Sequence, residues 1–317
     1  MLPTDITSFR ELLERFPTEQ SCIDWLEFRR WNGKVLSPFV PSTLAWKCKT
    51  GNKYICKKTN KYFTVRTKSI FEKTKIPLRD WFMAMWLLSD LKRGMSAKQL
   101  AKAVNVTEKT AWFMAHKIRN FYKLETEAEY IPQAIEAKVY ELDEACFGGL
   151  QANRHADKKI PNAAGGNGID KTWVLGIVLR TGFLKTFALT ARKPEYVQPI
   201  IRKYITPGST LITDAWTGYN GLDDEYTHLV VKDGKKIARN VDPNIHTNRI
   251  EGAWGNIKRG FNGTYNWWSK KHLQFYLDEF VFRYNTRKMK SAERFFLFLD
   301  NVFSRVTQRD IINRSWT

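Results

Sequence analysis

The stretch Val139-Tyr140-Glu141-Leu142-Asp143-Glu144-Ala145-Cys146-Phe147-Gly148-Gly149 decides the fold of the second half of the chain. It begins as a β-strand and ends in two acids and a glycine pair. Successive side chains of a strand point to opposite faces, so Asp143 and Glu144 are expected on opposite faces of the sheet. The stretch therefore predicts a central strand that carries an acid, Asp143, toward one of its faces.

A hairpin is predicted directly downstream of this strand. Residues 173–179 are apolar and β-branched, which is typical of a buried strand. A second strand is expected at 183–189, and Thr181-Gly182 between them forms a tight turn. Together with the first strand, this gives three consecutive strands.

The order of the following elements predicts the fold class. Residues 193–204 are helical, with Pro194 in the first turn, where proline is tolerated. A short buried strand follows at 209–214 and ends in Asp214, and another strand is expected at 226–231. Three strands, a helix, two more strands and a final helix indicate a mixed-sheet α/β domain (α+β overall) of the RNase H-like type.

The final helix of this domain is the stretch Asn248-Arg249-Ile250-Glu251-Gly252-Ala253-Trp254-Gly255-Asn256-Ile257-Lys258-Arg259. Ile250, Trp254 and Ile257 recur at the spacing of one helical face, which predicts a buried stripe. Glu251 and Lys258 are two turns apart and share the neighbouring face. We interpret the carboxylate as directed at a metal ion and the lysine at a phosphate; the alternative is an ordinary solvated helix face.

Residues 76–123, upstream of the central strand, are expected to be helical. Ser96 is a good N-cap for a helix over 97–104, Asn105 fits a left-handed turn, and Thr107 caps a second helix. Helix, short turn and second helix form the helix-turn-helix pattern, whose second helix enters the major groove of DNA. The alternative is an αα-hairpin packed in a core. The predicted DNA contacts of the second helix are Lys109, Thr110, His116, Lys117 and Arg119.

The N-terminal segment has the size and position of a zinc ribbon but lacks its ligands. Residues 5–30 are expected to be helical, and 31–65 to form short strands and turns. A ribbon needs two Cys-x-x-Cys knuckles, and the chain reads Ser37-Pro38-Phe39-Val40 and Cys56-Lys57-Lys58-Thr59 at these places. We therefore expect no structural zinc. The remnant is expected to be held by aromatic residues: Trp46, Tyr54 and Phe63.

The charge of the chain indicates a polyanionic partner. Its net charge is +20 and its pI is about 9.8, an excess that favours nucleic acid. No apolar run approaches the roughly 20 residues of a spanning helix, so no membrane partner is expected. The start, Met1-Leu2-Pro3-Thr4-Asp5, has no features of a secretory signal. With four cysteines that do not resemble a disulfide framework, we expect a cytoplasmic protein.

Several stretches together resemble the catalytic blocks of a DDE transposase, in the bacterial insertion-sequence branch related to Merlin elements. The blocks are Glu141-Leu142-Asp143-Glu144, Ile212-Thr213-Asp214-Ala215-Trp216-Thr217-Gly218-Tyr219 and His246-Thr247-Asn248-Arg249-Ile250-Glu251-Gly252-Ala253-Trp254. Asn153-Arg154-His155, Lys171-Thr172-Trp173-Val174, Tyr276-Leu277-Asp278-Glu279-Phe280 and Arg283-Tyr284-Asn285-Thr286-Arg287 are also similar to the family. The resemblance covers nearly the whole chain, and the ribbon is its one departure.

The resemblance implies a site for two Mg²⁺ (or Mn²⁺) ions. Phosphodiester cleavage needs an activated water and a stabilised leaving oxygen, and two ions roughly 3.5–4 Å apart can supply both. Hard divalent ions prefer carboxylate oxygens. Asp143 would bridge both ions, while Asp214 and Glu251 would each hold one. Lys258 would grip a phosphate of the DNA.

Other polar residues compete for roles near this site. Glu144 and Asn248 are alternative metal ligands, but Glu144 should face away and Glu251 is better placed on its helix. Asp278 and Glu279 are expected to pair with Arg283 or Arg287. Further DNA contacts are predicted for residues in or beside the family-like blocks: Arg154, His155, Asn248, Arg249 and Arg259.

The sequence thus predicts that the chain is divided into four segments and that the protein is a DNA transposase. We expect N-terminal helices and a degenerate ribbon over 1–70, a helix-turn-helix domain over 71–125, a catalytic domain over 135–295 and a tail over 296–317. The protein would bind terminal inverted repeats as a homodimer or higher oligomer, and would cut and join DNA on the bacterial nucleoid. The alternatives are an RNase H-like nuclease or resolvase without strand transfer, and a domesticated DNA-binding protein that no longer transposes.

Overall fold

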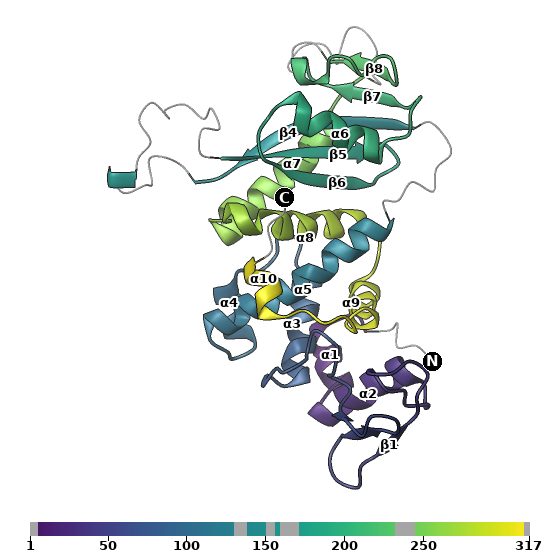
Figure 1. Ribbon diagram of the computed structural model, residues 1–317. Helices are drawn as coiled ribbons and strands as arrows, with labels where there is room; N and C mark the ends of the chain where they lie inside the picture. Colours follow the sequence, from purple (N-terminus) through teal and green to yellow (C-terminus); the bar gives the residue numbers. More distant parts are fainter. Residues whose placement is uncertain (1–5, 130–137, 150–155, 159–170, 232–244, 314–317) are drawn as a thin grey trace. The chain divides into compact units, whose positions relative to one another are not determined.

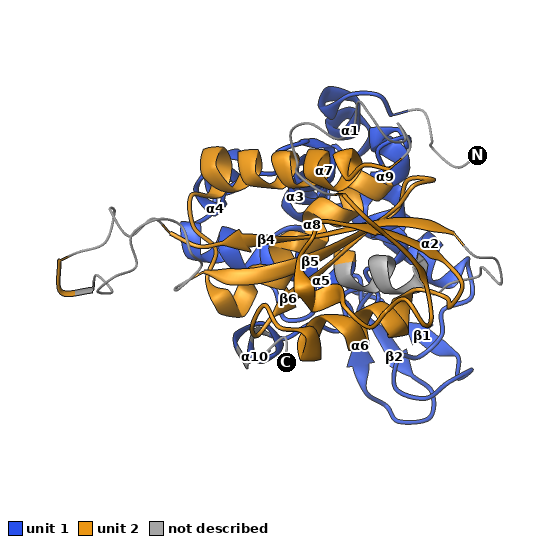
Figure 2. Cartoon of the chain, turned by 90° about the horizontal axis from the view of Figure 1, so that it is seen from above, with its two compact units in different colours: residues 1–121, 287–314 blue, residues 122–286, 315–317 orange. Residues whose placement is uncertain are grey.

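The computed structural model describes residues 6–129, 138–149, 156–158, 171–231 and 245–313. The chain divides into two compact units (Figure 2). Unit 1 comprises residues 1–121 and 287–314, and unit 2 comprises 122–286 and 315–317. Unit 1 is therefore built from two chain segments, one that precedes unit 2 in the sequence and one that follows residue 286.

Unit 2 contains the mixed sheet that the sequence predicts. Its strand order is β6-β5-β4-β7-β8, with β4 antiparallel to β5 and parallel to β7 (Figure 1). This is the sheet order of RNase H-like folds, and the predicted fold class is confirmed. The strands are β4 (Val139–Phe147), β5 (Thr172–Leu179), β6 (Leu184–Leu189), β7 (Thr210–Thr213) and β8 (Thr227–Val230).

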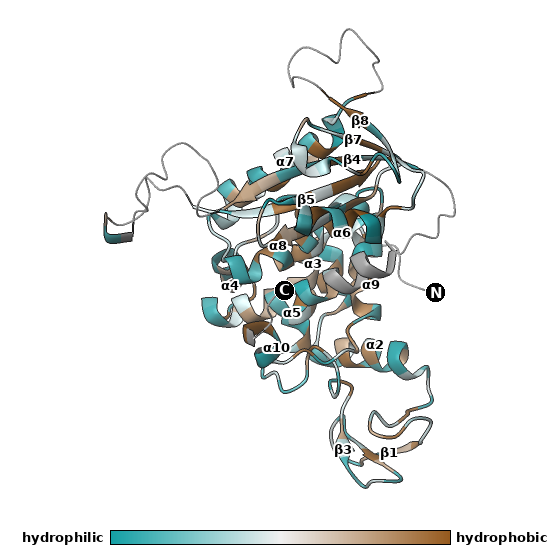
Figure 3. Cartoon of the chain, turned by 45° about the horizontal axis from the view of Figure 1, so that its top comes forward, coloured by the Kyte–Doolittle hydropathy of each residue, from teal (hydrophilic) through white to brown (hydrophobic). Residues whose placement is uncertain are grey.

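Helices cover both faces of this sheet, and alternation along β4 decides which side chains meet them. Tyr140 and Leu142 join the apolar cluster shared with α6 (Pro194–Tyr204). Ala145 and Phe147 join the cluster shared with α7 (Asn248–Gly260) and α8 (Leu273–Asn285). Figure 3 shows α6 largely in the hydrophilic colour where it is visible, as expected for a helix with one buried face.

The edge strand β6 is closed by side chains of α8. An exposed strand edge offers unpaired N–H and C=O groups to other chains. Gln274 accepts the N–H of Ala188 at 2.8 Å and donates to the carbonyl of Thr186 at 2.9 Å. Asn285 likewise accepts the Leu184 N–H at 2.8 Å. The helix therefore blocks further strand addition at this edge.

Short helical turns connect the larger elements of unit 2. They are η2 (Ala156–Lys158), η3 (Thr217–Tyr219), the π-turn η5 (Phe261–Tyr265) and η6 (Lys270–His272). On α8, Glu279 is buried and pairs with Arg283, as the sequence predicts. The Tyr265 hydroxyl also donates to Glu279 at 2.8 Å. The buried Glu279–Arg283 pair therefore lies within α8 and is also hydrogen-bonded to η5 through Tyr265.

Unit 1 is a helical assembly around an aromatic core. Phe16 packs on Phe82 with ring centroids 4.9 Å apart, and Phe295 packs on Phe82 at 5.9 Å. Phe295 belongs to a helix that follows unit 2, so the predicted boundary at 295/296 lies inside that helix. The helices are α1 (Phe9–Arg15), α2 (Glu19–Trp31), α3 (Leu78–Asp90), α4 (Ala97–Ala103), α5 (Glu108–Glu129, in unit 1 up to residue 121), α9 (Ser291–Asp300) and α10 (Gln308–Asn313).

The two helices and the short turn expected over 97–119 form from local signals. The hydroxyl of Ser96 accepts a hydrogen bond from the Gln99 N–H, and the side-chain oxygen of Gln99 accepts one from the Ser96 N–H. The two bonds form a capping box. Asn105 has φ 51°, the predicted left-handed conformation. Thr107 accepts the Thr110 N–H at 3.2 Å and starts α5. Each of these capping predictions is confirmed.

The ribbon-like segment forms a small antiparallel sheet, β1 (Ala45–Lys47), β2 (Tyr54–Cys56) and β3 (Tyr62–Phe63). Tyr54 stacks on Phe63 at 5.7 Å, as predicted. The prediction for Trp46 is wrong, since this residue is 61% exposed and lies under the Lys57 ammonium at 3.8 Å. Trp31 of α2 fills the core instead, 5.0 Å from the Tyr54 ring.

Hydroxyl groups surround the one cysteine that remains at the predicted knuckle positions. The side chains of Ser37 and Thr59 hydrogen-bond the sulfur of buried Cys56, and these bonds lower the pKa of the thiol to about 7. Ser37 and Thr59 both stand where a ribbon would carry cysteines. Polar contacts therefore connect positions that zinc would otherwise join.

None of the helices in the described part of the chain is long and apolar enough to cross a membrane.

Candidate functional site

The central strand of unit 2 brings acids from three elements together. Asp143 lies on β4 opposite Gly176 of β5. On the other side of β4, Glu141 pairs with Ile212 of the parallel strand β7. Continuing this register by two residues puts Asp214, directly after β7, beside Asp143. The sequence prediction that both strands deliver an acid to one place matches this register.

The electrostatics of Asp143 also reflect this convergence. Burial, together with the negative charges of Asp214 and Glu251, raises the pKa of Asp143 to about 6. The guanidinium of Arg192 acts in the opposite direction. Asp143 is thus a desolvated carboxyl group with two acidic neighbours, one from β7 and one from α7.

Helix α7 reaches the sheet because one position of β5 has no side chain. A Cβ on Gly176 would lie 2.6 Å from both the Ile250 Cδ1 atom and the Trp254 ring. Ile250, Trp254 and Ile257 are buried, which confirms the predicted apolar stripe of this helix. Glycine opposite Asp143 therefore lets the helix approach the strand that carries this acid.

Glu251 lies in the first turn of α7 and is exposed. Its Oε1 atom accepts a hydrogen bond from the Thr247 hydroxyl at 2.9 Å. Asp214 is about half exposed at 48% of its side chain, and its Oδ1 atom accepts the N–H of Trp216 at 3.0 Å. Both acids are therefore oriented by neighbours yet open to solvent.

Glu144 faces away from α7, as the alternation predicts, and takes part in a second network. Its carboxylate accepts a bond from the hydroxyl of buried Tyr219 and pairs with Arg192 at 2.9 Å. Burial raises the pKa of Glu144 to about 7 despite these partners. Glu144 is thus engaged on the α6 side of the sheet.

Arg192 connects this network to the acid cluster. Its guanidinium lies 3.7 Å from the Asp214 carboxylate and between the rings of Trp173 and Trp216, at 5.0 and 4.5 Å. A cation over an indole face is attracted by the ring quadrupole. Arg192 could not be predicted as a site residue from the sequence, because an isolated arginine after a strand carries no distinguishing pattern.

Both ends of α7 carry predicted DNA-contacting residues. Lys258 and Arg259 are exposed in its last turn, and Asn248 and Arg249 are exposed in its first. The Arg249 guanidinium already donates to the carbonyl of Arg180. Lys258 is on the exposed side with Glu251, as their spacing predicts. Arg154 and His155, two other predicted contacts, lie outside the described residues.

The predicted DNA contacts of α5 divide into accessible and buried side chains. Lys109 is exposed, and Thr110 is half-buried. His116 and Arg119 are 0% and 2% exposed, which places them within the packing of unit 1. The prediction of these two residues as DNA contacts is wrong, because packing inside the unit covers both side chains.

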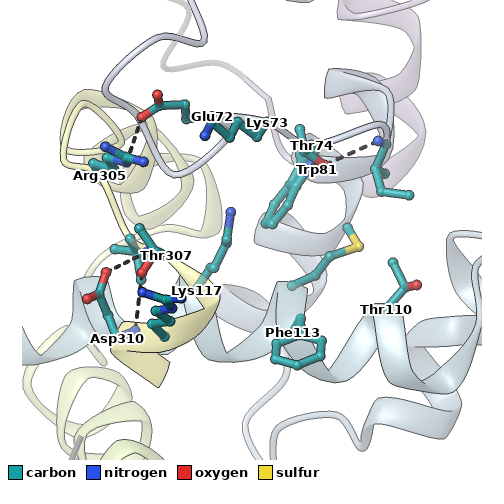
Figure 4. Close-up of a pocket in the computed structure, with 14 residues that line it drawn as sticks. Glu72, Lys73, Thr74, Trp81, Thr110, Phe113, Lys117, Arg305, Thr307 and Asp310 are labelled. Atoms are coloured by element: carbon teal, nitrogen blue, oxygen red, sulfur yellow. Dashed lines mark hydrogen bonds and ion pairs between the residues drawn. The ribbon is translucent and has the colours of Figure 1, made fainter. Parts of the chain in front are cut away.

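Lys117 lines a cavity of about 780 Å³ in unit 1 (Figure 4). Its ammonium donates to the Ile70 carbonyl at 2.7 Å, and burial lowers its pKa. The cavity combines basic and aromatic side chains, and its Arg305 pairs with Glu72 at 3.0 Å. Its remaining basic and aromatic lining residues are Lys73, Arg309, Trp81 and Phe113.

The three acids have the chemistry of a divalent-metal site. Carboxylate oxygens are the ligands that Mg²⁺ and Mn²⁺ prefer, and a cation would offset the repulsion that raises the Asp143 pKa. Within the described ranges, no three His, Cys, Asp or Glu side chains already stand in a cluster able to hold a metal ion. The donor types fit such an ion, and ligand geometry would require side-chain movement.

Comparisons with known proteins identify similar sequences. A family model described as an ISXO2-like transposase domain matches residues 137–285, which include all three acids. An uncharacterized transposase-like protein of Haemophilus influenzae is 33% identical over 97 residues, covering 29% of this chain and 73% of that protein.

Solved structures give a weaker likeness. The Mos1 transposase paired-end complex with left transposon end is 13% identical, with 70% of this chain and 80% of that chain covered and a TM-score of 0.26. The Mos1 Strand Transfer Complex is 12% identical, with 71% and 79% covered and a TM-score of 0.27.

Proposed function

The chain belongs to the ISXO2-like transposase family, and we propose that it binds the ends of an insertion sequence, cleaves there and joins the ends to target DNA. The observation that carries this proposal is that Asp143 of β4 lies in register with Asp214 after β7 and feels the charges of Asp214 and of Glu251 on α7. We further propose that it acts as a homodimer or higher oligomer on nucleoid DNA, because two ends must be joined in one event.

Asp143, Asp214 and Glu251 would hold two Mg²⁺ or Mn²⁺ ions. Bound there, the metal would help to generate the attacking oxygen nucleophile and would stabilise the leaving oxygen. Asp143 is fixed within the sheet, whereas the other two acids sit at the start or end of an element, where side chains can adjust. Arg192 pairs with Glu144 and offsets its charge, so Glu144 would not act as a metal ligand.

The proposed reaction has two steps that share this site. Water attacks a phosphodiester at the element end, the P–O3′ bond breaks, and a 3′-hydroxyl is released. That hydroxyl then attacks a target phosphodiester, so that one P–O bond forms as another breaks. No covalent protein–DNA intermediate is needed. Lys258 would hold a phosphate of the reacting strand.

Unit 1 would recognise the element ends. Its helix-turn-helix offers the second helix, α5, to the major groove, with Lys109 and Thr110 in the first turn. Lys117 and the other basic residues around the cavity would contact the phosphate backbone. Arg154, His155, Asn248, Arg249 and Arg259 would add contacts from unit 2.

Strand transfer with purified protein tests the whole proposal. The substrate is a labelled duplex that carries the element ends, mixed with supercoiled target DNA and Mg²⁺. We expect joined products. Cleavage without joining would favour an RNase H-like nuclease or resolvase, and end binding without either reaction would favour a domesticated DNA-binding protein.

We expect the binding of DNA to depend strongly on salt. Each phosphate that the protein neutralises contributes roughly −0.9 to the slope of log K against log salt. A chain with a net charge of +20 should give a slope steeper than about −4 by this rule. Fluorescence anisotropy titrations between low and moderate salt measure this slope, and a flat response would contradict nucleic-acid binding.

We also propose that the ribbon-like segment holds no structural zinc. Hydroxyl side chains do not replace the thiolates of a structural zinc site, and Ser37 and Thr59 instead hydrogen-bond Cys56. Elemental analysis of the purified protein would overturn this proposal if it found one zinc ion per chain.

A further inference from the structure

Glu141 is a buried carboxylate that the proposed reaction does not use. It lies on β4 two residues before Asp143 and therefore points to the same face of the sheet. Its side chain is 0% exposed. Burying a charged group is costly unless hydrogen bonds and opposite charges compensate it. The partners of Glu141 therefore reveal what this position does.

Two of these partners are backbone N–H groups at the start of α7. The Oε2 atom of Glu141 accepts the Arg249 N–H at 2.9 Å and the Ile250 N–H at 3.2 Å. The first turn of a helix has N–H groups without partners inside the helix, and a nearby carboxylate also interacts favourably with the helix dipole. Glu141 thus caps α7 from a strand more than a hundred residues earlier in the chain.

The local residue that would normally cap α7 is engaged elsewhere. Thr247 occupies the N-cap position, but its side chain makes no capping bond. Its hydroxyl donates instead to Glu251. The cap of α7 and the orientation of Glu251 are therefore divided between Glu141 and Thr247.

Two cationic or potentially cationic groups complete the surroundings of Glu141. Arg180, after β5, lies 3.2 Å from its Oε1 atom, and the Nδ1 atom of His246 lies 3.5 Å from the same oxygen. The Arg180 guanidinium also donates to the His246 carbonyl at 3.1 Å. One carboxylate thus joins β4, the end of β5 and the segment leading into α7.

We propose that Glu141 is a positioning residue that sets the separation of Asp143 and Glu251. It is two residues from the first acid along β4, and it binds the N–H of the residue just before the second. Gly176 supports the same arrangement, because it lets α7 lie directly against the strand beside Asp143. The catalytic consequence of this inference rests on the proposed function. The anchoring of α7 by Glu141 is independent of that function.

The first test measures the anchor in metal-free protein without DNA. Glu141→Gln keeps the size of the side chain but removes its charge, and charge-assisted bonds are about twice as strong as neutral ones. We expect hydrogen–deuterium exchange in the peptide covering 248–254 to accelerate on the order of tenfold. Exchange in β5 should stay unchanged. Equal exchange of α7 in the wild type and the variant would overturn the proposal.

The second test measures the separation of the two acids through metal affinity. Residues that orient metal ligands typically change metal affinity by about 10–100-fold when mutated. We expect Glu141→Gln to weaken Mn²⁺ binding, followed by electron paramagnetic resonance, by about tenfold or more. Glu141→Asp keeps the charge and should recover part of this loss. Unchanged Mn²⁺ affinity in Glu141→Gln would refute the positioning role.

Glu225→Gln is the matched control for both tests. Glu225 also lies in unit 2 and pairs with Arg202 at 2.6 Å, but it contacts neither β4 nor α7 in any bond described here. It should leave exchange of α7 and Mn²⁺ affinity at wild-type values. If wild-type protein bound Mn²⁺ but did not cleave DNA, the proposed function would fail while both tests of Glu141 remained decisive.

Discussion

Asp143→Asn, Asp214→Asn and Glu251→Gln are each expected to lower DNA cleavage and joining by roughly a thousandfold or more, with end binding intact. Metal ions contribute several kcal/mol of charge stabilisation in the transition state, and about 4 kcal/mol corresponds to three decades in rate. Each substitution removes one anionic ligand but hardly changes side-chain size. Asp143 should be the most sensitive, because it is the most enclosed of the three acids and interacts electrostatically with both of the others.

Single-turnover cleavage on pre-nicked and intact end DNA measures this effect, beside a binding titration on the same DNA. Asp224→Asn is a matched control, since Asp224 is an exposed acid of unit 2 in the turn before β8. It should cleave like the wild type. A variant of the three acids that cut at a near wild-type rate would show that its residue is wrongly assigned.

The parts of the fold that depend on local signals could be predicted from the sequence. The helix over 248–260 and its buried stripe follow from apolar spacing. The capping residues Ser96 and Thr107 and the left-handed Asn105 fix α4, the turn and the start of α5, because each acts on neighbouring backbone groups. The alternation in β4 likewise separates Asp143 from Glu144.

Burial of basic residues in unit 1 could not be predicted in the same way. His116 and Arg119 are polar and lie on a helix, so their sequence context favours solvent. A segment that returns to unit 1 after residue 287 packs against the same helix, with Phe298 4.4 Å from Phe121. Packing between segments so distant in the chain leaves no local pattern.

The anchor at Glu141 shows a related limit of the sequence. The spacing of Glu141 and Asp143 along the strand predicts that both acids lie on the same face of the sheet. This second acid on a buried face is the feature of the sequence that indicates a role for Glu141. Its partners are backbone N–H groups of α7, which have no side-chain identity to recognise. A capping bond between elements becomes apparent only when the register of β4 and the position of α7 are both known.

Lys258→Ala is expected to reduce cleavage about a hundredfold at saturating protein while lowering affinity for DNA only modestly. Lys258 is seven residues from Glu251, so roughly 10.5 Å along the helix axis at 1.5 Å per residue. That is about the distance from a metal centre to a phosphate one or two nucleotides away. A shift of the scissile bond by about 1 Å can cost around a hundredfold in rate, whereas the loss of one phosphate contact among many changes affinity little.

Lys258→Arg should restore only part of the rate, because arginine is a planar fork while lysine is a compact point charge that approaches phosphate differently. Lys203→Ala is the matched control, an exposed lysine on α6 in the same unit. It removes the same charge and should leave cleavage unchanged. If Lys258→Ala cleaved normally once saturated, Lys258 would be only a surface charge. The exposed face of α7 would then contribute Glu251 to the reaction, and the position of the DNA strand would have to be set by other residues.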